Sequence, residues 1–287
     1  MSLLEKIPVP AKKVIAVASG KGGVGKSTVT VILALALASR GYKVGLMDAD
    51  IYGPSIPTMF GVQDAKPFAI EKDGKTKIEP VNRFNINMLS IGFFVEPEKA
   101  LIWRGPMASN ALTSLFKDGE WGELDFMIVD LPPGTGDIHL TLVQTLPITG
   151  AVIVSTPQEV ALADARKGVA MFGQKDVNVP VLGFIENMSY FTPEELPDNK
   201  YYIFGKDGMK NLAKELDVPV LGEIPIVQSI RESGDKGYPI SLEEAHPVSI
   251  AFRETAAQLM KQVDLRHQNL DPTKVVEIDP NSKGCAT

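Results

Sequence analysis

The sequence predicts an α/β fold, namely a doubly wound, mostly parallel sheet of about seven to eight strands with helices on both faces. Continuous apolar runs of strand length alternate with helical segments along the chain, which is typical of a parallel sheet buried on both faces. In addition, the first of these strands leads into a glycine-rich loop and then into a helix. Because the alternation has no break, we predict one domain over residues 13–265.

Apolar runs and turn residues give the order of the elements. The predicted strands cover residues 13–18, 43–48, 85–90, 126–130, 151–155, 181–186 and 220–224. The predicted long helices cover residues 27–40, 105–116, 139–146, 160–172, 207–216 and 247–263. Pro54 and Pro57 indicate a short helix after the second strand, and Asp73-Gly74 predicts a hairpin turn within residues 60–80.

Composition and chain ends limit the classes of function. The net charge is -6, from 29 basic and 35 acidic residues without a basic run, which disfavours binding to nucleic acid or to an anionic membrane. No segment has the length of a membrane span or the apolar core of a secretory signal, so we predict a cytoplasmic protein. Residues 1–12 are expected to be an N-terminal extension, and its Met1-Ser2-Leu3 start is typical of a cloning scar. Because the first strand follows so closely, an N-terminal domain was either removed or never existed. Residues 266–287 are expected to form a polar tail that holds the only cysteine, Cys285.

The glycine-rich loop fits the phosphate-binding pattern G-x-x-x-x-G-K-[ST]. Glycines allow positive φ, so the backbone N–H groups turn inward and form a nest for phosphate oxygens. Lys26 is expected to reach the β- and γ-phosphates of a nucleotide, and the hydroxyl of Ser27 to hold Mg²⁺. The predicted phosphate-binding residues are Gly20, Lys21, Gly22, Gly23, Val24, Gly25, Lys26, Ser27 and Thr28.

Acidic residues follow two of the predicted strands. Asp130 comes after four apolar residues and has the position of a carboxylate that binds Mg²⁺; alternatively it caps the next turn. Asp48 and Asp50 share a face of an extended segment, so one can support Mg²⁺ while the other, for which we favour Asp50, orients or deprotonates the attacking water. A simple turn with two acids is the alternative. The predicted Mg²⁺ ligands are therefore Ser27, Asp48 and Asp130.

A second lysine, Lys21, lies directly after the first glycine of the loop. Because Lys21 lies on the outer rim of the loop, its ammonium does not have to contact the nucleotide bound by its own subunit. We expect it to reach a phosphate bound by a dimer partner. A cation supplied in this way neutralises charge on the transferred phosphoryl group. The alternative is a solvated loop lysine. Lys21, Lys26 and Asp50 are the predicted catalytic residues.

Residues 20–28 resemble the deviant Walker A loop of the MinD/ParA-type ATPases, a group of P-loop NTPases. Residues 48–55, Asp-Ala-Asp-Ile-Tyr-Gly-Pro-Ser, are similar to the Mrp/ApbC (Nbp-type) branch in particular. Three further segments match the same branch: 101–107, 130–137 and 186–191. The resemblance extends from about Val14 to the helix that ends near Val263.

This resemblance implies a homodimer that holds ATP, rather than GTP, between its subunits, with Lys21 acting across the dimer. It also implies that Asp50 and residues 130–137 form switch segments. Asn187 would read the adenine edge, with Pro225 and Ile226 lining the base. A turn residue that satisfies backbone groups is the alternative for Asn187.

Members of the family carry iron–sulfur clusters to apo-proteins and use a Cys-x-x-Cys pair shortly after the Asn-Met-Ser-Tyr-Phe segment. Here the corresponding residues, 192–200, contain no thiol, and Glu194 and Glu195 are expected to be solvated. A cluster normally takes four cysteine thiolates, whereas a dimer of this chain brings two copies of Cys285. Cys285 is therefore the candidate cluster ligand, and ligands from outside the chain would complete the cluster.

We therefore expect an ATP-binding and ATP-hydrolysing homodimer that acts as an iron–sulfur cluster carrier or assembly factor. Its expected cofactors are ATP and Mg²⁺, and its expected partners are apo iron–sulfur proteins, with no nucleic acid and no membrane. The alternative function is a MinD/ParA-like positioning or regulatory switch without a cluster. The three histidines have no metal-ligand spacing, so structural or surface roles are expected for them: His139, His246 and His267.

Overall fold

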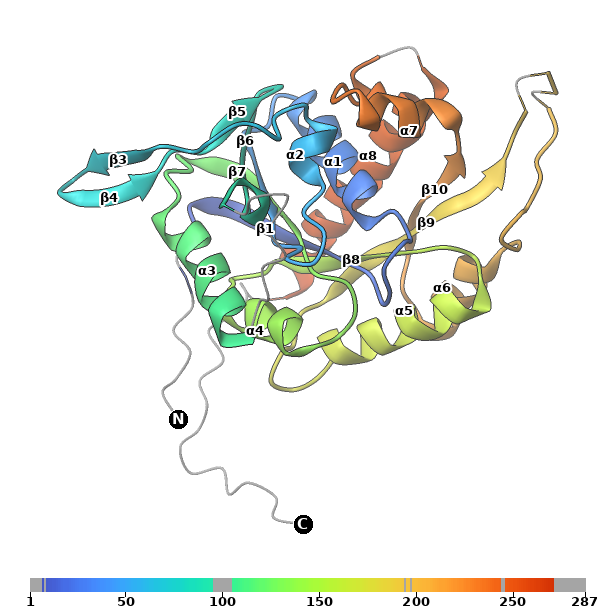
Figure 1. The fold of residues 1–287 in the computed structure, drawn as a ribbon. Helices are drawn as coiled ribbons and strands as arrows, with labels where there is room; N and C mark the ends of the chain where they lie inside the picture. Colours follow the sequence, from blue (N-terminus) through green and yellow to red (C-terminus); the bar gives the residue numbers. More distant parts are fainter. Residues whose placement is uncertain are drawn as a thin grey trace.

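A computed structural model describes residues 7, 9–94, 105–193, 195–196, 198–243 and 246–270. Its centre is one eight-stranded sheet in the order β10-β9-β8-β1-β7-β2-β6-β5 (Figure 1). All neighbours pair in parallel except β5, which pairs antiparallel with β6 at the edge. In sheet order the strands are β10 (Val220–Ile226), β9 (Val181–Phe191), β8 (Gly150–Ser155), β1 (Ala11–Ala18), β7 (Leu124–Asp130), β2 (Val44–Asp48), β6 (Ile86–Ser90) and β5 (Val81–Arg83). The predicted fold class is confirmed.

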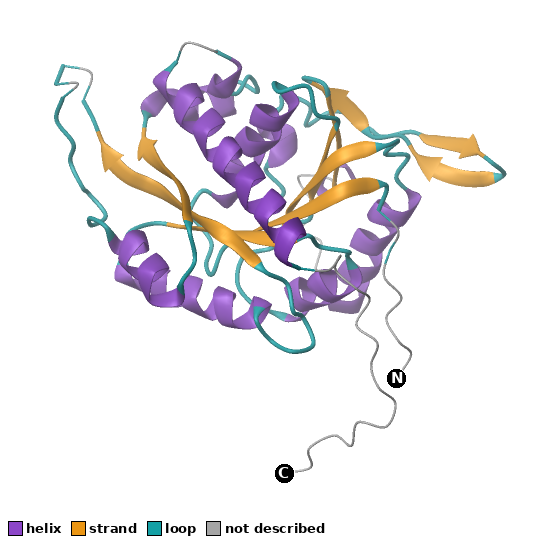
Figure 2. Ribbon diagram, turned by 180° about the vertical axis from the view of Figure 1, so that it is seen from behind, coloured by secondary structure: helices purple, strands orange, loops and turns teal. Residues whose placement is uncertain are grey.

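Helices cover both faces of this sheet, and each face has its own apolar core (Figure 2). One layer contains α1 (Lys26–Ala38), α2 (Ile56–Met59), α7 (Gln228–Asp235) and α8 (Pro247–Asn269). The other contains α3 (Gly105–Asp118), α4 (Asp137–Thr145), α5 (Glu159–Phe172) and α6 (Gly208–Leu216). Two short 3₁₀ helices, η1 (Ile91–Phe94) and η2 (Ile240–Leu242), complete the helical elements of the described part. Central strands such as β8 are buried at every residue, because both of their faces are covered.

The β3–β4 hairpin projects from one end of the molecule, and the connection after β9 projects from the other (Figures 1 and 2). β3 (Ala69–Lys72) and β4 (Lys75–Ile78) form a separate two-stranded sheet, with Asp73 and Gly74 both at positive φ in the turn. The hairpin predicted from Asp73-Gly74 is therefore present. Among the described residues, no helix combines the length and apolar character needed to cross a bilayer.

Ordered elements extend past both ends of the predicted domain, residues 13–265. Ile7 is buried in the core and donates its backbone N–H to the Thr145 carbonyl, and β1 already begins at Ala11, so these described residues of the predicted extension pack with the domain. At the other end α8 continues to Asn269 with Arg266 buried, so the tail cannot begin at residue 266. Residues 271–287, including Cys285, lie outside the described residues.

Two strands and one helix also differ from the prediction. β9 runs five residues beyond the predicted end at Glu186, so Asn187 lies within a strand rather than after it. β5 and α7 were not predicted. β5 is joined to β6 by a two-residue turn in which Phe84 and Asn85 both have positive φ, and this turn lacks the glycine that usually signals such a hairpin.

Candidate functional site

The functional residues converge because three neighbouring strands end together. β1, β7 and β2 are adjacent, and Asp130 is paired in register with Val17 on one side and with Asp48 on the other. The glycine loop leaves the end of β1 and enters α1 at Lys26. Ligands of open parallel sheets gather at this carboxyl edge. The sheet therefore brings the loop, Asp48 and Asp130 into one crevice, as the sequence predicted.

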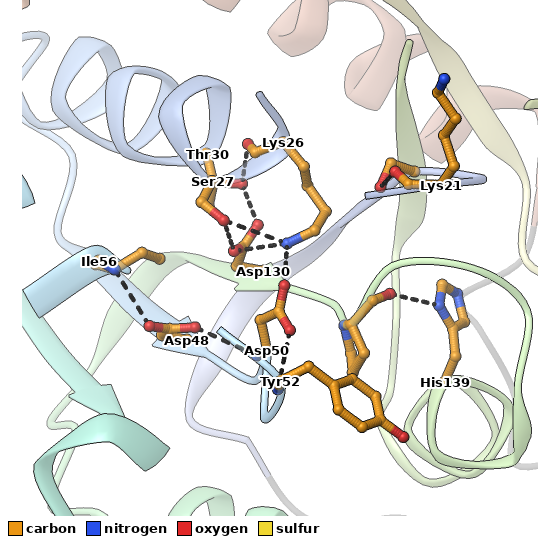
Figure 3. A network of polar contacts seen from close by, with 12 residues as sticks. Lys21, Lys26, Ser27, Thr30, Asp48, Asp50, Tyr52, Ile56, Asp130 and His139 are labelled. Atoms are coloured by element: carbon orange, nitrogen blue, oxygen red, sulfur yellow. Dashed lines mark hydrogen bonds and ion pairs between the residues drawn. The ribbon is translucent and has the colours of Figure 1, made fainter. Parts of the chain in front are cut away.

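A buried polar network connects the loop to Asp130 (Figure 3). Lys26 Nζ lies 2.8 Å from Asp130 Oδ2 and 3.3 Å from Asp50 Oδ2. Ser27 Oγ donates to Asp130 Oδ2 at 2.6 Å, and Thr30 Oγ1 donates to Asp130 Oδ1 at 2.6 Å. Both oxygens of Asp130 thus accept hydrogen bonds from α1. The carboxylate is fixed beside the lysine that the motif assigns to phosphate.

The charges in this network balance one another although they are buried. Burial alone would lower the pKa of Lys26, but the carboxylates of Asp130 and Asp50 outweigh it and raise that pKa, so the ammonium stays charged. Burial raises the pKa of Asp50, and Lys26 opposes that rise. The pair of Ser27 hydroxyl and Asp130 carboxylate offers the hard oxygen ligands that Mg²⁺ prefers. A cavity of about 210 Å³ lies over these groups, lined by Ser19, Gly22, Gly23, Gly25, Lys26, Ser27, Thr28, Asp50, Ser55, Met59 and Pro133.

Asp48 has partners of a different kind. It is fully buried, and it accepts hydrogen bonds from Ser90 Oγ at 2.9 Å and from the backbone N–H groups of Asp50 and Ile56. Burial and the neighbouring Asp130 raise its pKa to about 7. These contacts hold the segment that carries Asp50 against the sheet. They favour a positioning role for Asp48 over its predicted role as a Mg²⁺ ligand.

Lys21 stands apart from this network. Its ammonium has no hydrogen-bond or ion-pair partner among the described residues, and Figure 3 shows its side chain directed away from Lys26 and Asp130. The backbone of Lys21 is fixed, because Ser19 Oγ donates to its carbonyl oxygen at 2.9 Å. The loop thus presents a second cation outside its own phosphate nest.

A larger cavity of about 800 Å³ continues from the loop between α2 and α7. The three residues predicted to contact the base all line it: Asn187, Pro225 and Ile226. Asn187 Nδ2 donates one of its two N–H groups to the Val24 carbonyl at 2.8 Å, and this bond orients the amide in the cavity. Gly25 is required beside it, because a Cβ there would lie 2.2 Å from Asn187 Nδ2 and its φ is +79°.

This geometry predicts base preference. We expect Asn187 Oδ1 to accept from the exocyclic amine of adenine and to repel the guanine carbonyl at the same place. We expect Asn187→Ala to reduce the preference for ATP over GTP by roughly ten- to a hundredfold, on the scale of one buried polar contact. Competition of ATP and GTP for a fluorescent nucleotide measures this ratio. Ser189→Ala is the matched control, because Ser189 is buried in the same strand and donates to the Ile224 carbonyl; an unchanged ratio in Asn187→Ala would contradict the assignment.

Comparison with known proteins identifies the family. A family model described as the NUBPL iron-transfer P-loop NTPase, of the ParA group, matches residues 10–260. The chain belongs to the NUBPL iron-transfer P-loop NTPase family. A relative named iron-sulfur cluster carrier protein, from Aquifex aeolicus, is 49% identical over 265 residues, which cover 91% of this chain and 70% of the relative. The iron-sulfur cluster transfer protein NUBPL of Dictyostelium discoideum is 46% identical over 256 residues, which cover 88% of this chain and 77% of that one.

Solved structures agree with this family and with its fold. A nucleotide-binding protein from Archaeoglobus fulgidus in complex with ADP is 38% identical, with a TM-score of 0.71 over 85% of this chain and 92% of that chain. The cell division protein MinD of Aquifex aeolicus has a TM-score of 0.61 at 24% identity, and this likeness shows the shared fold alone. The recognised resemblance to Mrp/ApbC-type members of the MinD/ParA group is therefore confirmed.

Some segments by which the family resemblance was recognised lie outside the described residues. These are residues 101–104 of the Leu-Ile-Trp-Arg-Gly-Pro-Met segment. Glu194 and the candidate cluster ligand Cys285 also lie outside the described residues. The predicted cluster ligand therefore stays a prediction. Within the described part of the chain, no group of three or more His, Cys, Asp or Glu side chains is arranged to hold a metal ion.

His139, for which the sequence predicts only a structural or surface role, lies beside the loop that follows Asp130. His139 is 2% exposed, and its Nδ1 lies 3.1 Å from the Pro132 carbonyl. Its ring packs edge-on against Phe172 at 5.7 Å between ring centres. Burial lowers the pKa of His139 to about 4, so the ring is neutral at physiological pH. His246 has a different structural role, since its Nδ1 accepts the Val248 N–H at the start of α8.

A buried neutral histidine makes stability depend on pH. The unfolded chain takes up this proton below about pH 6.5, but folded His139 does so only near pH 4, so acid favours unfolding. We expect the wild type to lose about 1.4 kcal/mol per pH unit across this window relative to His139→Asn. Urea unfolding of both proteins at several pH values measures the difference. The raised pKa values of Asp48 and Asp50 change the pH dependence of stability in the opposite direction, but they do so equally in both proteins. If the unfolding free energies of the two proteins change in parallel with pH, the prediction is wrong.

Proposed function

We propose that this chain binds and slowly hydrolyses ATP as a homodimer with nucleotide between its subunits, and that it uses this cycle as a cytoplasmic carrier of iron–sulfur clusters. The observation that supports ATP chemistry most strongly is the buried Lys26–Asp130–Ser27 network beneath a phosphate-sized cavity. Iron–sulfur transfer is supported by relatives with 46–49% identity that are named for it.

Each residue of the network has a task in this proposal. Lys26 exchanges its contact with Asp130 for the β- and γ-phosphates, and Ser27 and Asp130 hold Mg²⁺, which neutralises phosphate charge when bound. Asp50 is held near the cavity by the Asp48 segment and orients the attacking water. Lys21 of the partner subunit neutralises the charge that develops on the transferred phosphoryl group.

Nucleotide-dependent dimerisation tests the first half of the proposal. We expect the Asp50→Asn protein to form a lasting dimer with Mg·ATP but not with Mg·ADP, because ATP is bound and not cleaved. Light scattering coupled to gel filtration measures the mass. A wild type that hydrolyses no ATP, or an Asp50→Asn protein that remains monomeric with Mg·ATP, would contradict this half of the proposal.

Cluster transfer needs ligands beyond this chain. Cys285 supplies one thiolate per subunit and two per dimer, whereas a cluster normally takes four. The remaining ligands must come from small thiols or from the receiving protein. Oxygen-free purification with iron and acid-labile sulfide analysis, followed by transfer to an apo-protein, tests this role; a wild type that neither holds nor transfers a cluster after reconstitution removes it.

The second candidate function is a MinD/ParA-like positioning or regulatory switch without a cluster. The observation that favours it is the single cysteine in 287 residues. In that case ATP-driven dimerisation serves only to present a surface to a partner. ATP-dependent co-sedimentation with liposomes or DNA, in a protein that holds no cluster, is the result that would select this candidate.

A further inference from the structure

Beyond Leu131, two hydrogen bonds attach residues 132–134 of the loop after Asp130 to the rest of the site. On one side the Gly134 N–H donates to the Ser19 carbonyl at 2.9 Å, which ties the loop to the entrance of the glycine loop. On the other side the Pro132 carbonyl lies 3.1 Å from His139 Nδ1 in the first turn of α4 (Figure 3). Between these attachments lies Pro133, which lines the phosphate cavity.

The chemistry of the second attachment is defined by its partners. A carbonyl oxygen can only accept, so Nδ1 of His139 carries the proton and Nε2 carries the lone pair. Nε2 is buried and has no hydrogen-bond partner among the described residues. The edge contact with Phe172, itself fully buried, fixes the plane of the ring. The histidine therefore acts as an oriented, neutral donor toward one backbone oxygen.

The loop between the attachments is short and stiff. Pro132 and Pro133 both have φ restricted by their rings, so a displacement of the Pro132 carbonyl is transmitted to Pro133 rather than absorbed. Gly134, at φ +87°, follows the two prolines, and its own N–H makes the bond to Ser19, so the Pro132–Pro133 pair is held at both ends. The position of Pro133 at the cavity thus depends on whether His139 holds the preceding carbonyl.

We infer that His139 is a positioning residue for ATP hydrolysis, which holds the Pro132 carbonyl and thereby fixes Pro133 beside the terminal phosphate. The inference rests on the proposed ATPase activity. It does not make His139 an acid or base, because the ring is buried and is not among the residues that line the cavity. Its contribution is to geometry, so its loss slows the chemical step and leaves the binding of nucleotide diphosphate unchanged.

Two amide substitutions separate this role from general packing. His139→Asn places an N–H near the position of Nδ1 and retains a donor to Pro132, whereas His139→Gln places it near Nε2, beyond reach of that carbonyl. We expect kcat to fall about tenfold in His139→Gln, equal to roughly 1.4 kcal/mol, and to stay within about threefold of wild type in His139→Asn. The Kd for ADP should change by less than about twofold in both. The shape of the pH–rate profile between pH 6 and 8 should be the same in wild type and His139→Asn.

Several results would overturn the inference. Wild-type kcat in His139→Gln, or equal losses in the Asn and Gln variants, would show that the bond to Pro132 is not responsible. If His139→Gln does not fold, His139→Phe, which retains the ring against Phe172 but lacks the donor, replaces it in the same comparison. A wild type that hydrolyses no ATP overturns the proposed function and this inference together, whereas equal rates in all variants overturn the inference alone.

Discussion

Replacing Lys21 by alanine is expected to abolish ATP hydrolysis while nucleotide binding is retained. The side chain of Lys21 points away from its own Lys26–Asp130 network and has no partner among the described residues, so its loss leaves the phosphate nest intact. A cation supplied across a dimer contributes about 10³- to 10⁵-fold to phosphoryl transfer, and we expect kcat to fall by about that factor. Phosphate release measures kcat, and a fluorescent ADP analogue measures binding.

Mixing two inactive variants tests whether Lys21 acts across the dimer. Asp50→Asn subunits bind nucleotide but lack the residue that orients water, and Lys21→Ala subunits lack the cation. In a mixed dimer, the site on the Lys21→Ala subunit has its own Asp50 and receives Lys21 of the partner subunit. Random pairing makes about half of the dimers mixed, and one of the two sites in each mixed dimer is complete. The mixture should therefore recover roughly a quarter of the wild-type rate.

The controls separate a specific effect from a change in surface charge. Lys206→Ala removes another loop lysine, one that stacks on Tyr202 at 5.0 Å, and should hydrolyse ATP at the normal rate. A mixture that stays inactive would place Lys21 in its own subunit's site. Normal hydrolysis by Lys21→Ala would remove the residue from the mechanism altogether.

The parts of the site that the sequence could predict are those set by local chain geometry. The glycine loop, the strand before it and the helix after it follow from residues that are neighbours in sequence, and the structure places them within two residues of the predicted limits. The sequence also predicted that Asp48 and Asp130 lie close together, because both residues end parallel strands. In these cases, a local pattern and a general rule of sheet topology were sufficient.

The features of the fold and the site that could not be predicted from the sequence depend on contacts between distant segments. Ser90 binds Asp48 from the neighbouring strand β6, and nothing near either residue signals that pairing. β9 continues past Glu186 although Met188 has a φ of +54° and its register with β10 shifts, because pairing with β10 overrides the local conformation. His139 was assigned no contact for the same reason: its partner Pro132 depends on how the loop folds back onto α4.

Replacing Lys26 by alanine is expected to eliminate nucleotide binding and also to destabilise the protein without nucleotide. Lys26 is 5% exposed and is paired with the buried carboxylates of Asp130 and Asp50. Removing it leaves these charges without the cation that compensates them, which costs about 3–5 kcal/mol when one partner of a buried pair is lost. Chemical unfolding measures the stability loss, and titration with fluorescent ADP and ATP measures binding.

Thr30→Val is the matched control for Lys26→Ala, because Thr30 donates to the other oxygen of the same carboxylate at 2.6 Å but lies outside the set of residues lining the phosphate cavity. We expect it to lower stability by about 1–3 kcal/mol, since a buried acceptor loses its donor, and to leave nucleotide binding within a few-fold of wild type. The two variants thus separate the contribution of the network to stability from its contact with phosphate. If both variants lost binding equally, Lys26 would act only by holding Asp130 in place, and its predicted contact with the β- and γ-phosphates would be wrong.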